Sequence, residues 1–249
     1  MDSTQIRQAI LERGYCVVEQ LISQADVNEL RDFWLAAFRP GLSTGPVIWT
    51  PYLGEPNRIM FHANKYGHLF RSYDFLWNRP LHEKTREIAL KLDVMRNSVI
   101  EAPANTGQAL VRDRYGIYVT TSYYPPLNGE LPEHRDHTDG RRHWHYVLPL
   151  TFKGTDFFSG GLFLTDRFGQ SVDMEAGVSP GSVIFYDGTL PHRVDPIDDG
   201  ARAQLGRLQM FAIQTHFALP QESERLAEQV SPVKYLKDRL RPLKRRLFG

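Results

Sequence analysis

The sequence has one cysteine, no long apolar run and almost no net charge. Its single cysteine, Cys16, can form no internal disulfide and cannot build a thiolate zinc site or an iron–sulfur cluster. Any metal site must therefore use histidine and carboxylate ligands. No run of about 18 apolar residues occurs, so a membrane-spanning helix is not predicted. The N-terminal residues lack the basic and apolar pattern of a signal peptide, and we expect a cytoplasmic protein.

The charges of the chain nearly cancel. Thirty Lys and Arg residues against 29 Asp and Glu residues give a net charge of +1, so no overall field attracts nucleic acid. The distribution is uneven, because residues 234–249 hold seven basic residues and one acid, a net charge of +6 that leaves −5 for the remainder. Two interpretations of this basic tail stay open, a solvated C-terminal segment or a weak contact with an anionic membrane surface.

The N-terminal part of the chain has helical periodicity. The composition, 41% hydrophobic and 24% charged residues, is that of a folded globular protein. Gly14 is a typical helix stop, and Ser23-x-x-Asp26 is a capping-box pattern that marks a helix start. We expect helices over residues 6–13, from Ser23 onward and over 81–100, and a short buried strand over residues 15–18.

Residues 39–80 are rich in proline, glycine and aromatic side chains. Pro40, Pro46, Pro51 and Pro56 interrupt any regular pattern. The segment is therefore predicted to be a long ordered loop region. It is a candidate for a substrate lid, and the alternative is a segment that only covers the core.

After Gly107 the periodicity changes from helical to strand-like. Short β-branched or aromatic runs are separated by Gly, Pro, Asp and Asn, a pattern typical of a barrel or sandwich such as a jelly roll. The fold class is thus mainly β with flanking α-helices, in a single domain over residues 1–233 with a helical part to about residue 106 and a core over about 107–220. The expected strands are 115–124, 144–152, 161–165, 182–186, 192–197 and 208–217.

Possible metal ligands concentrate in residues 129–140. In extended backbone, residues i and i+2 share a face, so His134 with Asp136, or His137 with Asp139, can offer an imidazole and a carboxylate to one metal. His192, at the start of a later strand, supplies a second imidazole. Two histidines and one carboxylate are typical of non-haem iron(II), because this set leaves coordination positions open for substrate and oxygen.

A set of short motifs occurs in order along residues 115–217. The motifs are Tyr124-Pro-Pro, Gly129-x-Leu131-x-x-His134-x-Asp136, Leu148-Pro-Leu150, Gly160-Gly161-x-Phe163, Pro180-Gly181-Ser182-x-x-Phe185, His192-x-Val194-x-Pro196 and Gly206-Arg207. The His-x-Asp pair alone is common by chance, whereas the ordered set is specific. The set resembles the iron(II)/2-oxoglutarate-dependent dioxygenases, and among them it is most similar to the phytanoyl-CoA and prolyl hydroxylase-like groups.

The resemblance implies a double-stranded β-helix with a metal at one mouth of the barrel. It implies iron(II) ligated by His134, Asp136 and His192, with 2-oxoglutarate and O₂ as cosubstrates. A basic residue near the last core strand would hold the distal carboxylate of 2-oxoglutarate. Arginine suits that role because its guanidinium presents parallel donors. We favour Arg207, which opens the strand, over the alternative Arg202, which lies in a predicted turn.

The activity implied is oxidation of a C–H bond, with release of succinate and CO₂, on an unidentified substrate that we expect to be a small molecule. An aspartate at the carboxylate position favours hydroxylation or a related oxidation over chlorination. Two other functions stay open, a cupin-like metal enzyme that does not use 2-oxoglutarate and a non-catalytic jelly-roll binding module. His143 and His145 are interpreted as residues that line the barrel or support the ligands. The oligomeric state is left open.

Overall fold

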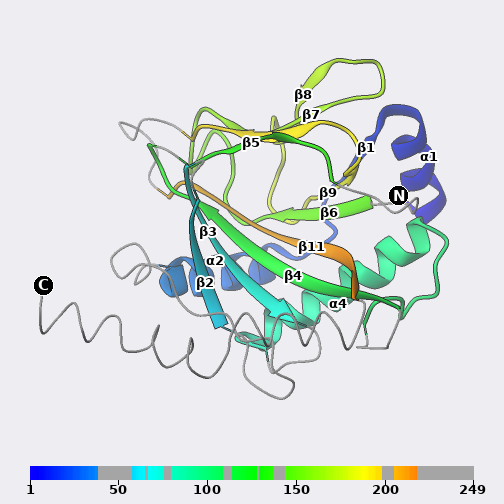
Figure 1. Ribbon diagram of the computed structural model, residues 1–249, viewed down its shortest axis with the longest axis horizontal. Helices are drawn as coiled ribbons and strands as arrows, with labels where there is room; N and C mark the ends of the chain where they lie inside the picture. The colour runs from blue at the N-terminus through cyan, green and yellow to red at the C-terminus, as the bar shows by residue number, and fades with distance from the viewer. Residues whose placement is uncertain are drawn as a thin grey trace, which may run out of the picture.

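The chain folds into two facing β-sheets with helices packed on the outer side of the larger one (Figure 1). The computed structural model describes residues 1–38, 58–64, 67–75, 80–108, 114–127, 129–136, 144–197 and 205–217. The sequence predictions for His137, Asp139, His143, Arg202 and the basic tail 234–249 lie outside these residues.

The N-terminal helices begin and end at sequence signals. Helix α1 (Ser3–Arg13) starts with a capping box between Asp2 and Gln5 and ends at Gly14, whose φ of 99° is a left-handed conformation that glycine adopts without strain. Helix α2 (Gln24–Phe38) starts after Ser23, whose Oγ accepts from the backbone N–H of Asp26 at 3.1 Å. Helix α4 (Glu83–Val99) completes the predicted set. These three helix predictions are confirmed.

The larger sheet contains seven antiparallel strands in the order β1-β9-β6-β11-β4-β3-β2. Its long central pair, β4 and β11, is in continuous register from Arg207 opposite Tyr124 to Phe217 opposite Arg114. The strands are β1 (Tyr15–Val18), β2 (Arg58–Asn64), β3 (Gly67–Phe75), β4 (Arg114–Tyr124), β6 (Trp144–Pro149), β9 (Val183–Asp187) and β11 (Arg207–Phe217).

The smaller sheet contains four antiparallel strands in the order β5-β10-β7-β8. Its side chains and those of the larger sheet meet in one apolar cluster between the sheets, to which Leu164, Val194 and Ile184 belong. This two-layer arrangement is the predicted jelly roll. The strands are β5 (Leu131–His134), β7 (Gly161–Thr165), β8 (Ser171–Asp173) and β10 (His192–Asp195).

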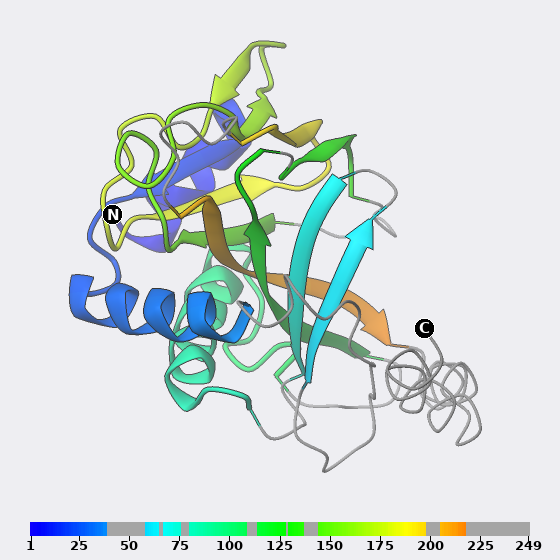
Figure 2. The same ribbon diagram turned by 90° about the vertical axis from the view of Figure 1, so that its left-hand side faces the viewer.

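A second apolar cluster joins the helices to the outer face of the larger sheet. Trp34 of α2, Leu92 of α4 and Met210 of β11 belong to it and are fully buried. Figure 2 shows α2 and α4 side by side on this face. Because each strand alternates its side chains, the same sheet has an apolar helix-facing side and an inner side that is free to carry polar groups.

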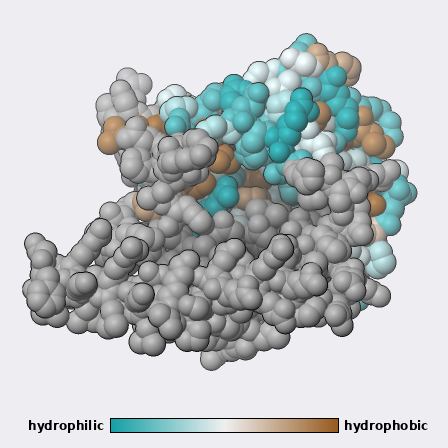
Figure 3. Space-filling model, viewed as in Figure 1, coloured by the Kyte–Doolittle hydropathy of each residue, from teal (hydrophilic) through white to brown (hydrophobic). Residues whose placement is uncertain are grey.

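The exposed face seen in Figure 3 is mostly hydrophilic over the described residues, and its hydrophobic residues form small separate groups. None of the helices in the described ranges combines the length and the apolarity that crossing a bilayer requires.

The prediction of a long loop over residues 39–80 is wrong for its second half. Residues 58–64 and 67–75 form the antiparallel pair β2–β3, which extends the larger sheet beyond β4. The prolines that suggested a loop all precede Arg58, whereas the following residues contain none before Pro80. The breakers therefore carry no information on the second half, whose pairing partner, β4, lies about 50 residues away in the sequence. The first half of the predicted loop and lid, residues 39–57, lies outside the described residues.

Candidate metal centre

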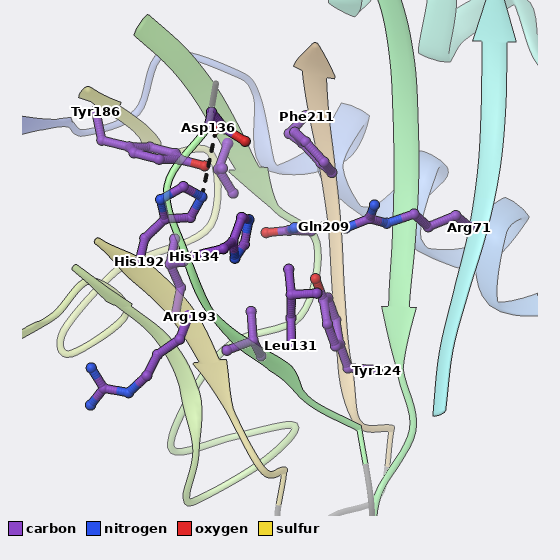
Figure 4. A pocket seen from close by; sticks show the side chains of 13 residues that line it. Arg71, Tyr124, Leu131, His134, Asp136, Tyr186, His192, Arg193, Gln209 and Phe211 are labelled. Carbon is purple, nitrogen blue, oxygen red and sulfur yellow. Dashed lines mark ion pairs between the residues drawn. The ribbon is translucent and has the colours of Figure 1, made fainter. Parts of the chain in front are cut away.

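Strands β5 and β10 bring the two predicted histidine ligands together. The two strands are antiparallel neighbours, and His192 lies directly opposite His134 in the register. Asp136 follows the end of β5, where its backbone N–H donates to the carbonyl of Gly188 at 2.8 Å. One ligand atom from each of His134, Asp136 and His192 lies within 4.8 Å of the others, close enough for one metal ion to bind all three (Figure 4).

Backbone hydrogen bonds orient both imidazoles. Nδ1 of His134 lies 2.9 Å from the carbonyl of Pro132, and Nδ1 of His192 lies 2.9 Å from that of Leu190. Because a carbonyl only accepts, each Nδ1 carries a proton, and in the neutral imidazole Nε2 is then the nitrogen that presents its lone pair. This tautomer is the one that metal-binding histidines adopt when their second nitrogen is held by the protein.

The protonation of the other groups also suits a cation. Burial lowers the pKa of His192 to about 4, which keeps this imidazole neutral near pH 7. Burial alone would raise the pKa of Asp136, but the hydrogen bond from His145 and the nearby imidazoles lower it to about 2. The cluster therefore offers two imidazoles and one carboxylate, the donor set of non-haem iron(II).

A third histidine holds the aspartate in place. Nε2 of His145, on β6, lies 2.7 Å from Oδ2 of Asp136, and the His145 side chain is buried. A Cβ at Gly188 would lie 2.4 Å from Nε2 of His145 and 2.6 Å from Oδ2 of Asp136, so a larger residue there would displace these two side chains. Buried Tyr186 packs its ring 5.4 Å from that of His145 and 5.2 Å from that of His192. His145 thus supports a ligand, one of the two roles that the sequence left open for it.

The triad opens into a pocket between the sheets. The wall opposite the histidines belongs to β3, β4 and β11 and contributes Arg71, Tyr124, Gln209 and Phe211 (Figure 4). Sequence reasoning assigned no role to Arg71 or Gln209, because the strand register that places them opposite the triad is not visible in the local sequence.

Arg207, the predicted anchor for 2-oxoglutarate, lies fully buried at the start of β11, next to the wall residues Gln209 and Tyr124. Its Nε bonds both carboxylate oxygens of Glu175, at 3.0 and 2.8 Å, and its Nη2 donates to Oε1 of Gln209 at 2.6 Å. The guanidinium carbon lies 5.0 Å from the ring centroid of Tyr124. Arg207 therefore touches two residues of the pocket wall without lining the pocket itself.

Two buried polar atoms at this end of the pocket lack partners among the described residues. They are Nη1 of Arg207 and the hydroxyl of Tyr124. An unmet buried donor costs about 1–3 kcal/mol, and a bound carboxylate would satisfy both atoms. The residues present thus fit both iron(II), at the triad, and a dicarboxylic acid that reaches from the triad toward Arg207.

Neither a family model nor a curated protein sequence matches the chain. Solved structures do. A prolyl-4-hydroxylase from Pseudomonas putida is 16% identical with a TM-score of 0.59, over 86% of this chain and 99% of that one. AviO1 from Streptomyces viridochromogenes is 15% identical with a TM-score of 0.55, over 88% and 96%.

A third structure, the epimerase SnoN from nogalamycin biosynthesis, was solved with Fe³⁺, α-ketoglutarate and nogalamycin RO. It is 11% identical with a TM-score of 0.56, over 86% of this chain and 83% of that one. At these identities the similarity establishes the fold. The chain has the jelly-roll fold of the iron(II)/2-oxoglutarate oxygenases, as the ordered motifs predicted, and a His-Asp-His cluster is present in it.

Proposed function

We propose that this protein is an iron(II)- and 2-oxoglutarate-dependent oxygenase that oxidises a C–H bond of a small molecule and releases succinate and CO₂. The observation that carries the proposal is the cluster of His134, Asp136 and His192 at a pocket between the sheets, with both Nε2 atoms available. Three protein ligands leave positions for a chelating keto acid and for oxygen. The iron supplies the oxygen chemistry, and the protein supplies binding and orientation.

Each residue of the site has a distinct task in this proposal. His134, Asp136 and His192 hold the metal, and His145 keeps the carboxylate of Asp136 pointed at it. Nη1 of Arg207 and the hydroxyl of Tyr124 bind the distal carboxylate of 2-oxoglutarate. Glu175 fixes the guanidinium from the other side through Nε. The apolar cluster between the sheets excludes water from the inner end of the pocket.

The test is metal-dependent binding of 2-oxoglutarate, followed by turnover. Calorimetric titration under anaerobic conditions should show tight binding of 2-oxoglutarate only after iron(II) is added, and succinate should form when oxygen is admitted. Asp136→Ala should abolish both signals. Glu133→Gln is the matched control, because Glu133 is an exposed acid three residues earlier that lies outside the triad.

Two results would favour the alternative functions. Metal binding without any affinity for 2-oxoglutarate would favour a cupin-like enzyme. If neither the metal nor 2-oxoglutarate binds, a non-catalytic jelly-roll binding module would be favoured.

A further inference from the structure

Arg71 and Gln209, two polar residues of the pocket wall opposite the triad, lie in one row of the sheet with buried Ser122 between them. In the register of the larger sheet, Ser122 of β4 pairs with Arg71 of β3 on one side and with Gln209 of β11 on the other. Directly paired residues share one face of a sheet, and neighbouring strands lie about 4.8 Å apart. Arg71, Ser122 and Gln209 therefore form one continuous row on the inner face.

The row presents hydrogen-bond donors. Oε1 of Gln209 accepts from Arg207 at 2.6 Å, and because a guanidinium only donates, the amide NH₂ of Gln209 is the group left for other partners. Ser122 is fully buried, and its Oγ has no hydrogen-bond partner among the residues that the structure describes. The guanidinium of Arg71 lies 5.5 Å from the ring centroid of Phe211 and reaches from β3 toward Gln209 (Figure 4).

The other charged groups of the pocket do not belong to this wall. Arg193 also lines the pocket, but its Nε bonds Asp195 at 2.7 Å and its side chain is directed away from the wall (Figure 4). Asp136 belongs to the triad and is bonded to His145. The positive charge of Arg71 thus faces the triad across the pocket, and the carboxylate of the triad would be neutralised by a bound cation.

We propose that Arg71, Ser122 and Gln209 bind an anionic group, a carboxylate or a phosphate, of the substrate that is oxidised. A wall of one cation and two neutral donors matches an acceptor-only group, since carboxylate and phosphate oxygens accept from several donors at once. The inference rests on the proposed function and names its substrate class, a small organic acid or phosphate ester. Its C–H bond is held toward the metal while its acid group lies against β3 and β11.

The test uses Mn(II) in place of iron(II), together with 2-oxoglutarate and two simple anions. Mn(II) at the triad shortens the nuclear relaxation time of any anion that binds in the same pocket. Inorganic phosphate is followed by ³¹P relaxation and acetate by ¹³C relaxation, each titrated into the Mn(II) and 2-oxoglutarate complex. Whichever anion binds more tightly identifies the acid group of the substrate.

Four proteins are compared, the wild type, Arg71→Met, Arg71→Lys and Arg193→Met. Arg71→Met should weaken anion binding by about tenfold or more, the effect of losing a charge-assisted hydrogen bond. Its affinity for 2-oxoglutarate should stay within about twofold of the wild type. Arg193→Met removes the other arginine of the pocket and should leave anion binding unchanged. Arg71→Lys keeps the charge and should recover part of the affinity, which separates anion binding from a loss of folding.

Four results would overturn the inference. Equal relaxation in the wild type and Arg71→Met, or none in the wild type, would show that Arg71 holds no anion. Loss of 2-oxoglutarate affinity in Arg71→Met would assign Arg71 to the cosubstrate. If Mn(II) binds but 2-oxoglutarate does not bind to the wild type, the proposed function fails and the inference fails with it.

Discussion

Strand β6 carries two buried polar clusters, one on each of its faces. His145 points inward, where it bonds Asp136 beside the pocket. Its neighbour Tyr146 points outward, where its hydroxyl donates to the carbonyl of Ala89 in α4 at 3.1 Å. Asp93 and Arg96 of α4 complete the outer cluster, with Nη2 of Arg96 3.2 Å from Oδ1 of Asp93. The alternation of one strand thus serves two sites of different character.

The two clusters differ in their access to solvent. Asp93, Arg96 and Tyr146 are fully buried and line no part of the pocket beside the triad. A ligand bound in that pocket would therefore not reach the side-chain atoms of Asp93 and Arg96 that lack hydrogen-bond partners among the described residues. Burial raises the pKa of Asp93 to about 6, although Arg96 opposes that change. Asp136 is half-buried beside the pocket, and its pKa is lowered to about 2. Both clusters thus contain buried ionisable groups with altered pKa values, but only the inner cluster borders a pocket. Burial alone is therefore not a sign of a binding site in this protein.

Removing a ligand from the inner cluster should have the largest effect. Asp136→Ala and His192→Ala each leave two protein donors, and the affinity for iron(II) should fall by more than about 100-fold, beyond the loss typical of supporting residues. Anaerobic metal titration measures the affinity, and circular dichroism checks the fold. Asp139→Ala is the companion variant from the alternative pair. Loss of iron in Asp139→Ala with full retention in Asp136→Ala would move the ligand assignment to that pair.

Removing the residue that anchors 2-oxoglutarate should have the second-largest effect. Removing Arg207 alone would leave the buried carboxylate of Glu175 without its positive partner. The double variant Arg207→Met, Glu175→Gln is therefore compared with the single variant Glu175→Gln. Affinity for 2-oxoglutarate should fall by about 2–5 kcal/mol, or roughly 30-fold to several thousand-fold. Titration of 2-oxoglutarate with iron(II) present gives the value. Arg202→Ala should bind normally, and weak binding by Arg202→Ala alone would transfer the role to Arg202.

Asp93 of the outer cluster should make the free energy of unfolding depend on pH. The pKa of Asp93 is about 6 in the folded protein against an ordinary 3.8, so the folded state holds this proton more tightly than the unfolded state. Its contribution to the free energy of unfolding is full below pH 4 and is lost as the pH rises through 6, about 3 kcal/mol in all.

The measurement is urea unfolding of the metal-free wild type and Asp93→Asn at pH 4, 5 and 6. All other groups titrate in both proteins and cancel in the difference. The wild type should lose stability relative to Asp93→Asn as the pH rises. A constant difference over this range would show that Arg96 holds Asp93 ionised throughout.

The smallest effect should come from His145. His145→Phe removes the hydrogen bond to Asp136 and should weaken iron(II) binding by about 10–100-fold, the range for residues that orient a ligand. His145→Gln keeps an N–H donor and should recover part of the affinity. Equal loss in both variants would mean that His145 acts through packing against Tyr186 rather than through its hydrogen bond.

The sequence was informative wherever the signal was local. Strand β7 has the predicted bounds, Gly161–Thr165, because alternation and flanking turn residues define it without help from the rest of the chain. The His134-x-Asp136 spacing and His192 were visible for the same reason. The residues of the opposite pocket wall could not be predicted in this way. Arg71 and Gln209 come together only through the register of β3 and β11 with β4, which no local pattern reveals. Strand β8 was missed because three residues give too short a pattern.

One measurement decides whether the inner cluster of His134, Asp136 and His192 is an iron site. Crystals grown anaerobically with iron(II) and 2-oxoglutarate should give an anomalous scattering peak, at the iron absorption edge, bonded to Nε2 of His134, Nε2 of His192 and the carboxylate of Asp136. The distal carboxylate of 2-oxoglutarate should contact Arg207. A peak bonded to other side chains, or no peak at the triad under saturating iron(II), would show that the inner cluster does not bind iron.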